Sequence, residues 1–325
     1  MNRRLMLLAT TGLAMPPLLG LRPVLGQNFP ERPLRLVVPW PPGGSTDTVA
    51  RIFQPRLAEL LGRTIIIDNR GGASGATGAI EAARAPADGS SWMLAYDTQA
   101  TNETVMRLPF RTMEAFAPVC LVATGPLAMM AHQSTPWRSF EEVVAAAKAA
   151  PETINYATSG VGGLAHVSTT LLQQQRDFRI VHIPYRGGGP AVTDAVAGHV
   201  PLFMTNVVIV SQHMRAGTLR PLGVTTAGES RHVPGTRSFA QQGFAGFEAP
   251  TWWAMLGRAG TPPVLLARMQ EALARVLNEP EVKNRIEDQG CDVVASSAEQ
   301  CRDFLAREIS KWAEVIRRND IRVDS

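Results

Sequence analysis

The stretch VVPWPPGGSTDTVARIFQPRLAELLG, residues 37–62, decides the fold class of this chain. An apolar run typical of a strand leads into three prolines and two glycines, and an amphipathic helical pattern follows. The first N–H groups of a helix have no partners within the helix and carry a partial positive charge. Bare glycine backbone and the Ser45 hydroxyl at that point predict a site for an anion. The anion is a cofactor phosphate, a reacting group or a carried ligand.

Short β-branched or apolar runs continue to alternate with helical patterns along the chain. This alternation predicts an α/β fold with a parallel sheet covered by helices on both faces. The predicted strands are 34–40, 64–69, 91–97, 126–132, 154–159, 179–185, 201–206 and 220–226. The predicted helices are 47–61, 75–85, 139–149, 163–176, 191–197, 207–216, 263–278 and 298–319.

Two of these helices carry further signals. Ser139 with Glu142 three residues later forms a capping-box pattern at a helix start. In the last helix, apolar residues recur with helical spacing, which predicts that this stripe packs on a sheet as core. The stripe consists of Leu305, Ile309, Trp312 and Ile316.

Glycine and small polar residues separate a strand from a helix at four places. These junctions read PPGGSTD (41–47), NRGGASGATG (69–78), ATSGVGGLAH (157–166) and YRGGGPAVTD (185–194). Ligands of open α/β sheets bind at the carboxyl ends of strands, where such junctions meet. One glycine-rich turn is most often only a turn, but four that converge would form an anion site with few charged side chains.

The first 26 residues have the pattern of a secretory signal peptide, with a basic start, an uncharged apolar run and small residues near Gly26. An uncleaved anchor is the alternative, and Arg3-Arg4 would also fit a twin-arginine export signal weakly. Without this segment the 32 basic residues fall to 29, against 28 acidic ones. The near-neutral mature chain gives no indication of nucleic-acid binding.

The cysteines and histidines predict neither a disulfide framework nor a metal site. There are three cysteines, and Cys291–Cys301 is the only local pairing to consider, so buried thiols are the favoured interpretation. The six histidines do not pair with each other or with cysteine at metal-ligand spacing. We therefore expect no metal and no cofactor.

Enzyme patterns match poorly. The stretch GGASGATG (71–78) imitates a dinucleotide-binding loop, with Asp97 about 20 residues further on, but its glycine spacing differs from G-x-G-x-x-G. No serine lies in G-x-S-x-G, although a Ser-His-Asp set assembled in space stays possible. His166 either has a role at the site, as a hydrogen-bond donor in the cleft or as a support for the 159–163 loop, or it is an ordinary helix-surface histidine.

Four larger side chains flank the junctions. Arg70 and Arg186 would each either clamp a carboxylate with two hydrogen bonds or remain solvated loop charges. Trp40 and Tyr185 would either form the wall of a pocket or end a core strand.

Five motifs in order resemble one known family. They are RLVVPWPPGGSTDTVAR (35–51), IIIDNRGGASGATGAIEAARAPADG (65–89), INYATSGVGGLAH (154–166), IPYRGGGPAVTDAVAGHV (183–200) and LGVTTAGESRHVPGTRSFAQQGF (222–244). Together they are similar to the Bug-type extracytoplasmic substrate-binding receptors of tripartite tricarboxylate transporters. The likeness extends from about residue 30 to the end of the chain.

The resemblance implies a two-domain Venus-flytrap architecture of the periplasmic-binding-protein type, type II-like, with crossover strands as the hinge. Domain 1 would comprise residues 27–128 and 226–325, and domain 2 residues 129–225, with crossings near Met129 and Thr225. It also implies a non-enzymatic, monomeric periplasmic receptor that captures a small organic anion and delivers it to membrane permease subunits. A receptor that presents its ligand to a sensor kinase is the alternative, and a nucleotide-dependent α/β enzyme is a third.

The junctions and the resemblance together imply a ligand cradle of backbone amides and hydroxyls, mainly at Gly43, Gly44 and Ser45. A side chain added at Gly44 is expected to block the ligand, and a positive φ there would add strain. Asp47 would touch the ligand or cap the helix. Trp40 replaces the phenylalanine or tyrosine of many relatives, and Asn206 replaces an acid common among them, which favours a plain carboxylate or an uncharged group over amino-acid ligands. The full predicted set is Trp40, Gly43, Gly44, Ser45, Asp47, Arg70, Ala73, Asp97, Thr98, Ser159, Gly160, Val161, His166, Tyr185, Arg186, Gly187 and Asn206.

Overall fold

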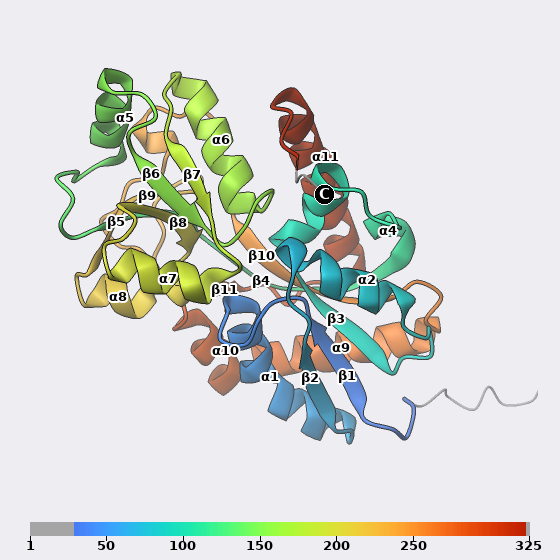
Figure 1. Cartoon of the computed structure of the whole chain (residues 1–325). Helices are drawn as coiled ribbons and strands as arrows, with labels where there is room; N and C mark the ends of the chain where they lie inside the picture. The colour runs from blue at the N-terminus through green and yellow to red at the C-terminus, as the bar shows by residue number, and fades with distance from the viewer. Residues whose placement is uncertain (1–28, 323–325) are drawn as a thin grey trace, which may run out of the picture.

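The computed structural model describes residues 29–322, and the predicted signal peptide lies outside these residues. The chain forms two lobes, each built on one sheet, as Figure 1 shows. The first sheet has six strands in the order β11-β4-β10-β3-β1-β2, and the second has five in the order β7-β6-β8-β5-β9.

The first lobe contains both ends of the described chain. Its strands are β1 (Leu34–Val38), β2 (Ile65–Asn69), β3 (Ser91–Tyr96), β4 (Phe116–Gly125), β10 (Thr251–Arg258) and β11 (Asp292–Val293). Its helices are α1 (Ser45–Leu61), η1 (Ala73–Gly75), α2 (Ala76–Arg84), η2 (Asp97–Ala100), α3 (Asn102–Val105), α4 (Thr112–Ala115), α9 (Pro263–Asn278), α10 (Pro280–Glu287) and α11 (Ala298–Arg318).

The second lobe lies between β4 and β10 in the chain. Its strands are β5 (Leu127–His132), β6 (Asn155–Thr158), β7 (Val181–Pro184), β8 (Leu202–Asn206) and β9 (Leu219–Val224). Its helices are α5 (Phe140–Ala149), α6 (Leu164–Arg176), α7 (Gly188–Val196), η3 (Val207–Ile209), α8 (Ser211–Arg215) and η4 (Ala240–Gln242).

Apolar cores cover both faces of the first sheet. Because side chains alternate along a strand, Trp252 and Trp253 of β10 enter different cores, and both are fully buried. Trp253 packs in the core that α1 and α9 help to form, whereas Trp252 shares its core with the stripe of α11. In that stripe Leu305, Trp312 and Ile316 are buried, so the prediction of a core-facing final helix is confirmed.

The expectation of a purely parallel sheet is wrong. β1 pairs in parallel with β2 and β3, but β10 is antiparallel to both β3 and β4, and β5 is antiparallel to β8 and β9. The cause is the passage of the chain between lobes: β4 leaves the first sheet and continues through Pro126 into β5, while β10 returns to the first sheet, so β5 and β10 run against their neighbours. The sequence patterns did not identify β4, β10 and α10.

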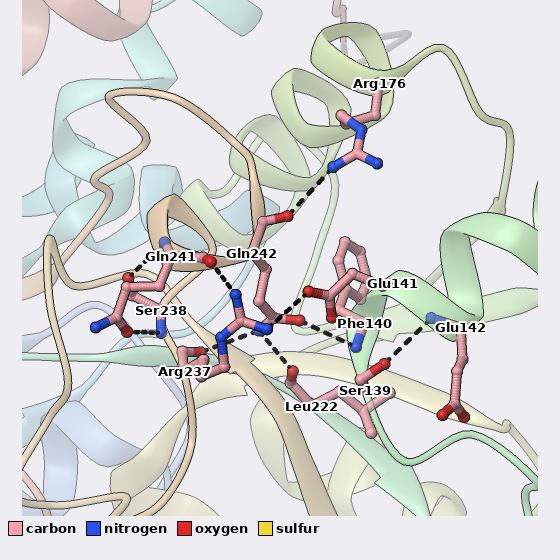
Figure 2. Close-up of polar contacts among 10 residues, drawn as sticks. All are labelled: Ser139, Phe140, Glu141, Glu142, Arg176, Leu222, Arg237, Ser238, Gln241 and Gln242. Atoms are coloured by element: carbon pink, nitrogen blue, oxygen red, sulfur yellow. Dashed lines mark hydrogen bonds and ion pairs between the residues drawn. The ribbon is translucent and has the colours of Figure 1, made fainter.

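The chain after β9 stays against the second lobe before it returns to β10. Phe239 packs on Phe140 of α5, with ring centroids 4.9 Å apart. The buried Gln242 amide accepts from Phe140 N at 3.2 Å and donates to Leu222 O of β9 at 2.9 Å, as Figure 2 shows. Segment 225–250 is therefore tied to the lobe that it leaves, and the domain limits at 128/129 and 225/226 stay predictions.

The thiols agree with expectation, whereas the capping box predicted at Ser139 forms only in part. Ser139 Oγ accepts from Glu142 N at 3.3 Å at the start of α5, while the Glu142 carboxylate accepts from Arg138 N. All three cysteines are free and buried, so the interpretation as buried thiols is confirmed and the considered Cys291–Cys301 disulfide is absent from the described residues.

Candidate functional site

Two adjoining cavities lie between the lobes, at the carboxyl ends of strands from both sheets. With volumes of about 60 and 20 Å³ they enclose little space, because the lobes touch around them. The first is lined by Trp40, Pro41, Pro42, Gly44, Ser45, Tyr96, Ser159, Gly187, Gly188, Gly189, Pro190, Asn206 and Ile209. The second is lined by Trp40, Ser74, Tyr96, Asp97, Thr98, Leu127, Thr158, Ser159, Gly160, Gly163, Leu164, Ala165, Thr205 and Asn206.

Asp47 stabilises the first junction, which lies between β1 and α1. This side chain lies in the first turn of α1 and its Oδ2 accepts from Gly43 N at 3.0 Å. Asn69 Nδ2 donates both to Asp47 Oδ1 and to Trp40 O, each at 3.0 Å. Asp47 therefore supports the loop from outside the two cavities, while Gly44 and Ser45 line the first.

The charge on Asp47 is kept by its surroundings. Burial disfavours the carboxylate, but hydrogen bonds from Arg51 and from two neutral donors outweigh it and hold the pKa of Asp47 below its ordinary value. Arg51 Nε lies 2.9 Å from Asp47 Oδ2, so the buried acid is neutralised locally. It does not oppose an anion in the cleft as an unpaired charge would.

The expected positive φ at Gly44 is wrong. Gly44 has φ −75° and ψ 168° as the N-cap of α1, whereas Gly43 has φ +79°. The positive φ occurs at Gly43, where the backbone turns so that Gly43 N donates to Asp47 Oδ2. A side chain at Gly44 would therefore act by entering the cavity and not through backbone strain.

The second junction, between β2 and α2, contributes Ser74. Its Oγ donates to Val161 O of the second lobe at 2.8 Å, so the hydrogen bond crosses the cleft. Ala73 is exposed and lines neither cavity. The half-exposed Arg70 pairs with Asp68 at 2.8 Å and Glu81 at 3.4 Å, and it also lies outside both linings.

The third junction, between β6 and α6, is shaped by Thr158. Its Oγ1 donates to Gly160 O at 2.9 Å and lies 2.7 Å from His182 Nε2. His166 Nδ1 accepts from Gly162 N at 3.1 Å, and its ring stacks on His182 with centroids 4.0 Å apart. His166 is therefore placed as a support of the loop, outside the cavities.

Both imidazoles of this stack are neutral near pH 7. Burial lowers the pKa of His166 to about 4 and that of His182 to about 3, and the proximity of His166 contributes to the shift at His182. The Gly162 N–H needs an acceptor at His166 Nδ1, which only the neutral ring provides. Within residues 29–322, no hydrogen-bonded Ser-His-Asp chain includes these rings.

The fourth junction, between β7 and α7, brings glycine backbone to the first cavity. Gly187 N donates to Ser159 O at 3.1 Å, which joins the third and fourth loops. The Tyr185 hydroxyl donates to Asp194 Oδ2 at 2.7 Å, and the Arg186 side chain is exposed. Neither side chain lines a cavity, whereas residues 187–190 do.

Asn206, at the end of β8, connects the lobes at the cavity floor. Its Nδ2 donates to Tyr96 OH at 2.9 Å and to Ser45 Oγ at 3.2 Å, and both partners belong to the first lobe. Asn206 is only 5% exposed. Together with the Ser74–Val161 bond, this contact holds the lobes in a closed arrangement.

Three lining residues have buried polar atoms without a hydrogen-bond partner among the described residues. They are the Trp40 Nε1 donor, the Asn206 Oδ1 acceptor and the Thr205 hydroxyl. Their residues are 8%, 5% and 2% exposed. Because most buried polar groups are hydrogen-bonded, these atoms are available for a bound molecule.

The acid at the floor of the second cavity is Asp97. It is 2% exposed, and its Oδ2 accepts from Thr251 Oγ1 of β10 at 2.5 Å. Burial raises the pKa of Asp97 to about 7, because no cation compensates the loss of water.

The structure brings together part of the predicted set. Lining a cavity are Trp40, Gly44, Ser45, Asp97, Thr98, Ser159, Gly160, Gly187 and Asn206. Outside both linings are Gly43, Asp47, Arg70, Ala73, Val161, His166, Tyr185 and Arg186.

Sequence reasoning missed several lining residues for two reasons. Ser74, Gly163 and residues 188–190 lie within the four glycine-rich junctions, so that signal could have found them. Tyr96, Thr158 and Thr205 end strands or precede the last strand residue, and no local pattern distinguishes them. Their role depends on how the two sheets face each other.

Two α/β lobes joined by crossover strands, with glycine-rich strand ends facing a shared cleft, define the class of periplasmic binding proteins. Residues 49–321 match the model of the tripartite tricarboxylate transporter family receptor. The chain belongs to that family.

Individual relatives agree over almost the whole length. Protein BugT of Bordetella pertussis (strain Tohama I) is 33% identical over 313 residues, 95% of this chain and 94% of the relative. The solved structure of R. palustris Rpa4515 with adipate is 29% identical, with a TM-score of 0.85 and coverage of 89% of this chain and 98% of the other. MatC from Rhodopseudomonas palustris with bound malate is 27% identical, with a TM-score of 0.83 and coverage of 89% and 100%.

Between residues 29 and 322, none of the helices combines the length and apolar character needed to cross a bilayer.

Proposed function

We propose that this protein is a periplasmic receptor that captures a small carboxylate between its lobes and delivers it to the membrane permease of a tripartite tricarboxylate-type transporter. The family and the two relatives with bound adipate and malate support the carboxylate. Residues 1–26 serve as the export signal, and the receptor works as a monomer without a cofactor. The two domains are 27–128 with 226–325, and 129–225.

The observation that carries this proposal is the convergence of helix N-termini. The starts of α1 and α6 bring Ser45 and Leu164 to the cavities, and the start of α7 brings Gly188. Each presents N–H groups without intrahelical acceptors and a partial positive charge. Among the described lining residues there is no lysine or arginine. The site therefore attracts an anion through backbone dipoles, with Trp40 Nε1 as an added donor.

This arrangement favours the backbone cradle over an arginine clamp. Arg70 already pairs with Asp68 and Glu81, and Arg186 is exposed beside the cleft. An arginine that stays in water or is already paired contributes little to binding. The proposed ligand contacts are thus the lining members of the predicted set, while Asp47 and His166 position the loops.

A thermal-shift screen tests the function. The panel contains mono-, di- and tricarboxylates, including malate, adipate and citrate, together with amino acids, aromatic acids, cations and nucleotides. A ligand at a hundredfold excess over its Kd stabilises the folded state by about 2.7 kcal/mol. We expect carboxylates to raise Tm. A rise with cations or nucleotides only would overturn the proposal.

A further inference from the structure

One titratable group faces the cleft without a countercharge. Asp97 follows β3 directly, lines the second cavity with Thr98 and Gly160, and is 2% exposed. Thr251 Oγ1 donates to its Oδ2 at 2.5 Å, and hydrogen bonds from the Tyr96 hydroxyl and the Thr98 N–H also favour the carboxylate. These neutral donors do not outweigh the loss of water, so the buried carboxylate remains costly, and the cost falls when the group binds a proton.

The groups packed around Asp97 include an acid and neutral donors. From α11, the 7% exposed Glu308 acts on Asp97 as a second negative charge. The hydroxyls of Tyr96 from β3 and Thr251 from β10 favour the carboxylate, but they are neutral and do not outweigh its burial. Within residues 29–322, no lysine, arginine or histidine forms an ion pair with Asp97.

We infer that the receptor binds its organic anion together with one proton, and that the Asp97 carboxyl is the site of that proton. This inference rests on the proposed function, because it needs an anion in the cleft. The ligand brings a negative charge into the same buried space, and two like charges that share a site cannot both stay ionised at low cost. Asp97 then takes a proton from solvent and becomes a neutral carboxylic acid.

The direction in which anion affinity changes with pH follows from the pKa of Asp97 in the free protein. Burial already raises the pKa of Asp97 to about 7, and a bound anion raises it further. Below pH 7 the free receptor is already protonated, so binding takes up little. Between pH 7 and the higher pKa of the complex, each binding event takes up to one proton. The affinity therefore falls by at most about tenfold per pH unit above pH 7.

Calorimetry in two buffers measures this uptake. Malate, adipate and citrate are titrated into the full mature protein at pH 6 in MES and Bis-Tris and at pH 8 in HEPES and Tris, two pairs of buffers that differ in ionisation enthalpy. We expect an uptake at pH 8 that approaches one proton and falls at pH 6. For Asp97→Asn we expect no uptake, and an affinity that no longer falls between pH 7 and pH 8.

Two further variants keep the test decisive. Glu308→Gln, which changes the other buried acid, should retain the uptake at pH 8. If Asp97→Asn fails to fold, Thr251→Val serves instead: it removes the donor that favours the carboxylate, so the free receptor is already protonated and the uptake at pH 8 falls.

The possible results distinguish a failure of the Asp97 proton site from a failure of the proposed receptor function. Equal heats in both buffers at pH 8, or an uptake that persists in Asp97→Asn, overturn the proton site but leave the receptor function intact. If none of the three anions binds at either pH, the proposed function falls and the inference with it.

Discussion

A methyl group added at Gly160 should disturb the contact that joins the closed lobes. A Cβ built on Gly160 would lie 2.6 Å from Ser74 Oγ in the opposite lobe, and real Cβ contacts essentially never come below 3.0 Å. Ser74 Oγ is also the donor to Val161 O at 2.8 Å. Gly160→Ala therefore forces either the lobes apart or the hydroxyl away from its acceptor.

The structure sets the expected size of the effect. Loss of the Ser74–Val161 hydrogen bond costs about 0.5–1.5 kcal/mol, or roughly a twofold to twelvefold loss in affinity. The residual clash adds to this, so Gly160→Ala should weaken binding at least about tenfold, equivalent to about 1.4 kcal/mol. Gly160 has φ +157°, and the strain of alanine there is present in open and closed forms alike. That strain lowers stability and not affinity.

A double-mutant cycle isolates the clash. After Ser74→Ala the nearest atom to the added methyl is Ser74 Cβ at 3.7 Å, an ordinary contact. We therefore expect Ser74→Ala and the double variant to bind equally, with Gly160→Ala alone the weakest. Calorimetry with the best carboxylate of the thermal-shift panel measures all four proteins. Unchanged binding by Gly160→Ala, or additive losses in the double variant, would refute closure through this contact.

Three further predictions address the cradle, the buried acid and the fold. Gly44→Val should weaken carboxylate binding at least about tenfold in calorimetry, because its side chain enters the first cavity; the exposed Arg186→Gln should change it less. An arginine variant that abolishes binding while Gly44→Val binds normally would contradict the backbone cradle. In Asp97→Asn, the gain in unfolding free energy over the unmodified protein should grow from about pH 4 to pH 7 and then level off, because the folded pKa is raised to about 7. A pH-independent difference in denaturant titrations would contradict this. Gln242→Leu should cost about 1–3 kcal/mol, since it leaves the buried Phe140 N–H without its acceptor; an unchanged Tm would show that segment 225–250 is not held by this amide.

Local features were readable from the sequence because the forces that create them act over a few residues. The prolines and glycines of 39–44 end a strand and begin a helix through their own backbone limits, and α1 starts there as expected. The Ser139 cap and the stripe of α11 follow from hydrogen bonds and side-chain periodicity within one helix. The same reasoning placed the four junctions at strand ends, where a ligand cleft forms.

Tertiary structure decided which chemical groups face that cleft. Asn206 meets Tyr96 across 110 positions of sequence and Ser45 across 161, so no local pattern could predict these bonds. Arg70 lies at a junction, where the sequence made it a candidate to bind a carboxylate, but it forms ion pairs with neighbouring acids of β2 and α2. The sequence patterns did not identify β4 and β10, and the antiparallel partners of these strands are set by the crossing between lobes. The sequence determined where backbone is offered to a ligand, and only the packing of one lobe against the other determined which side chains stay free to bind it.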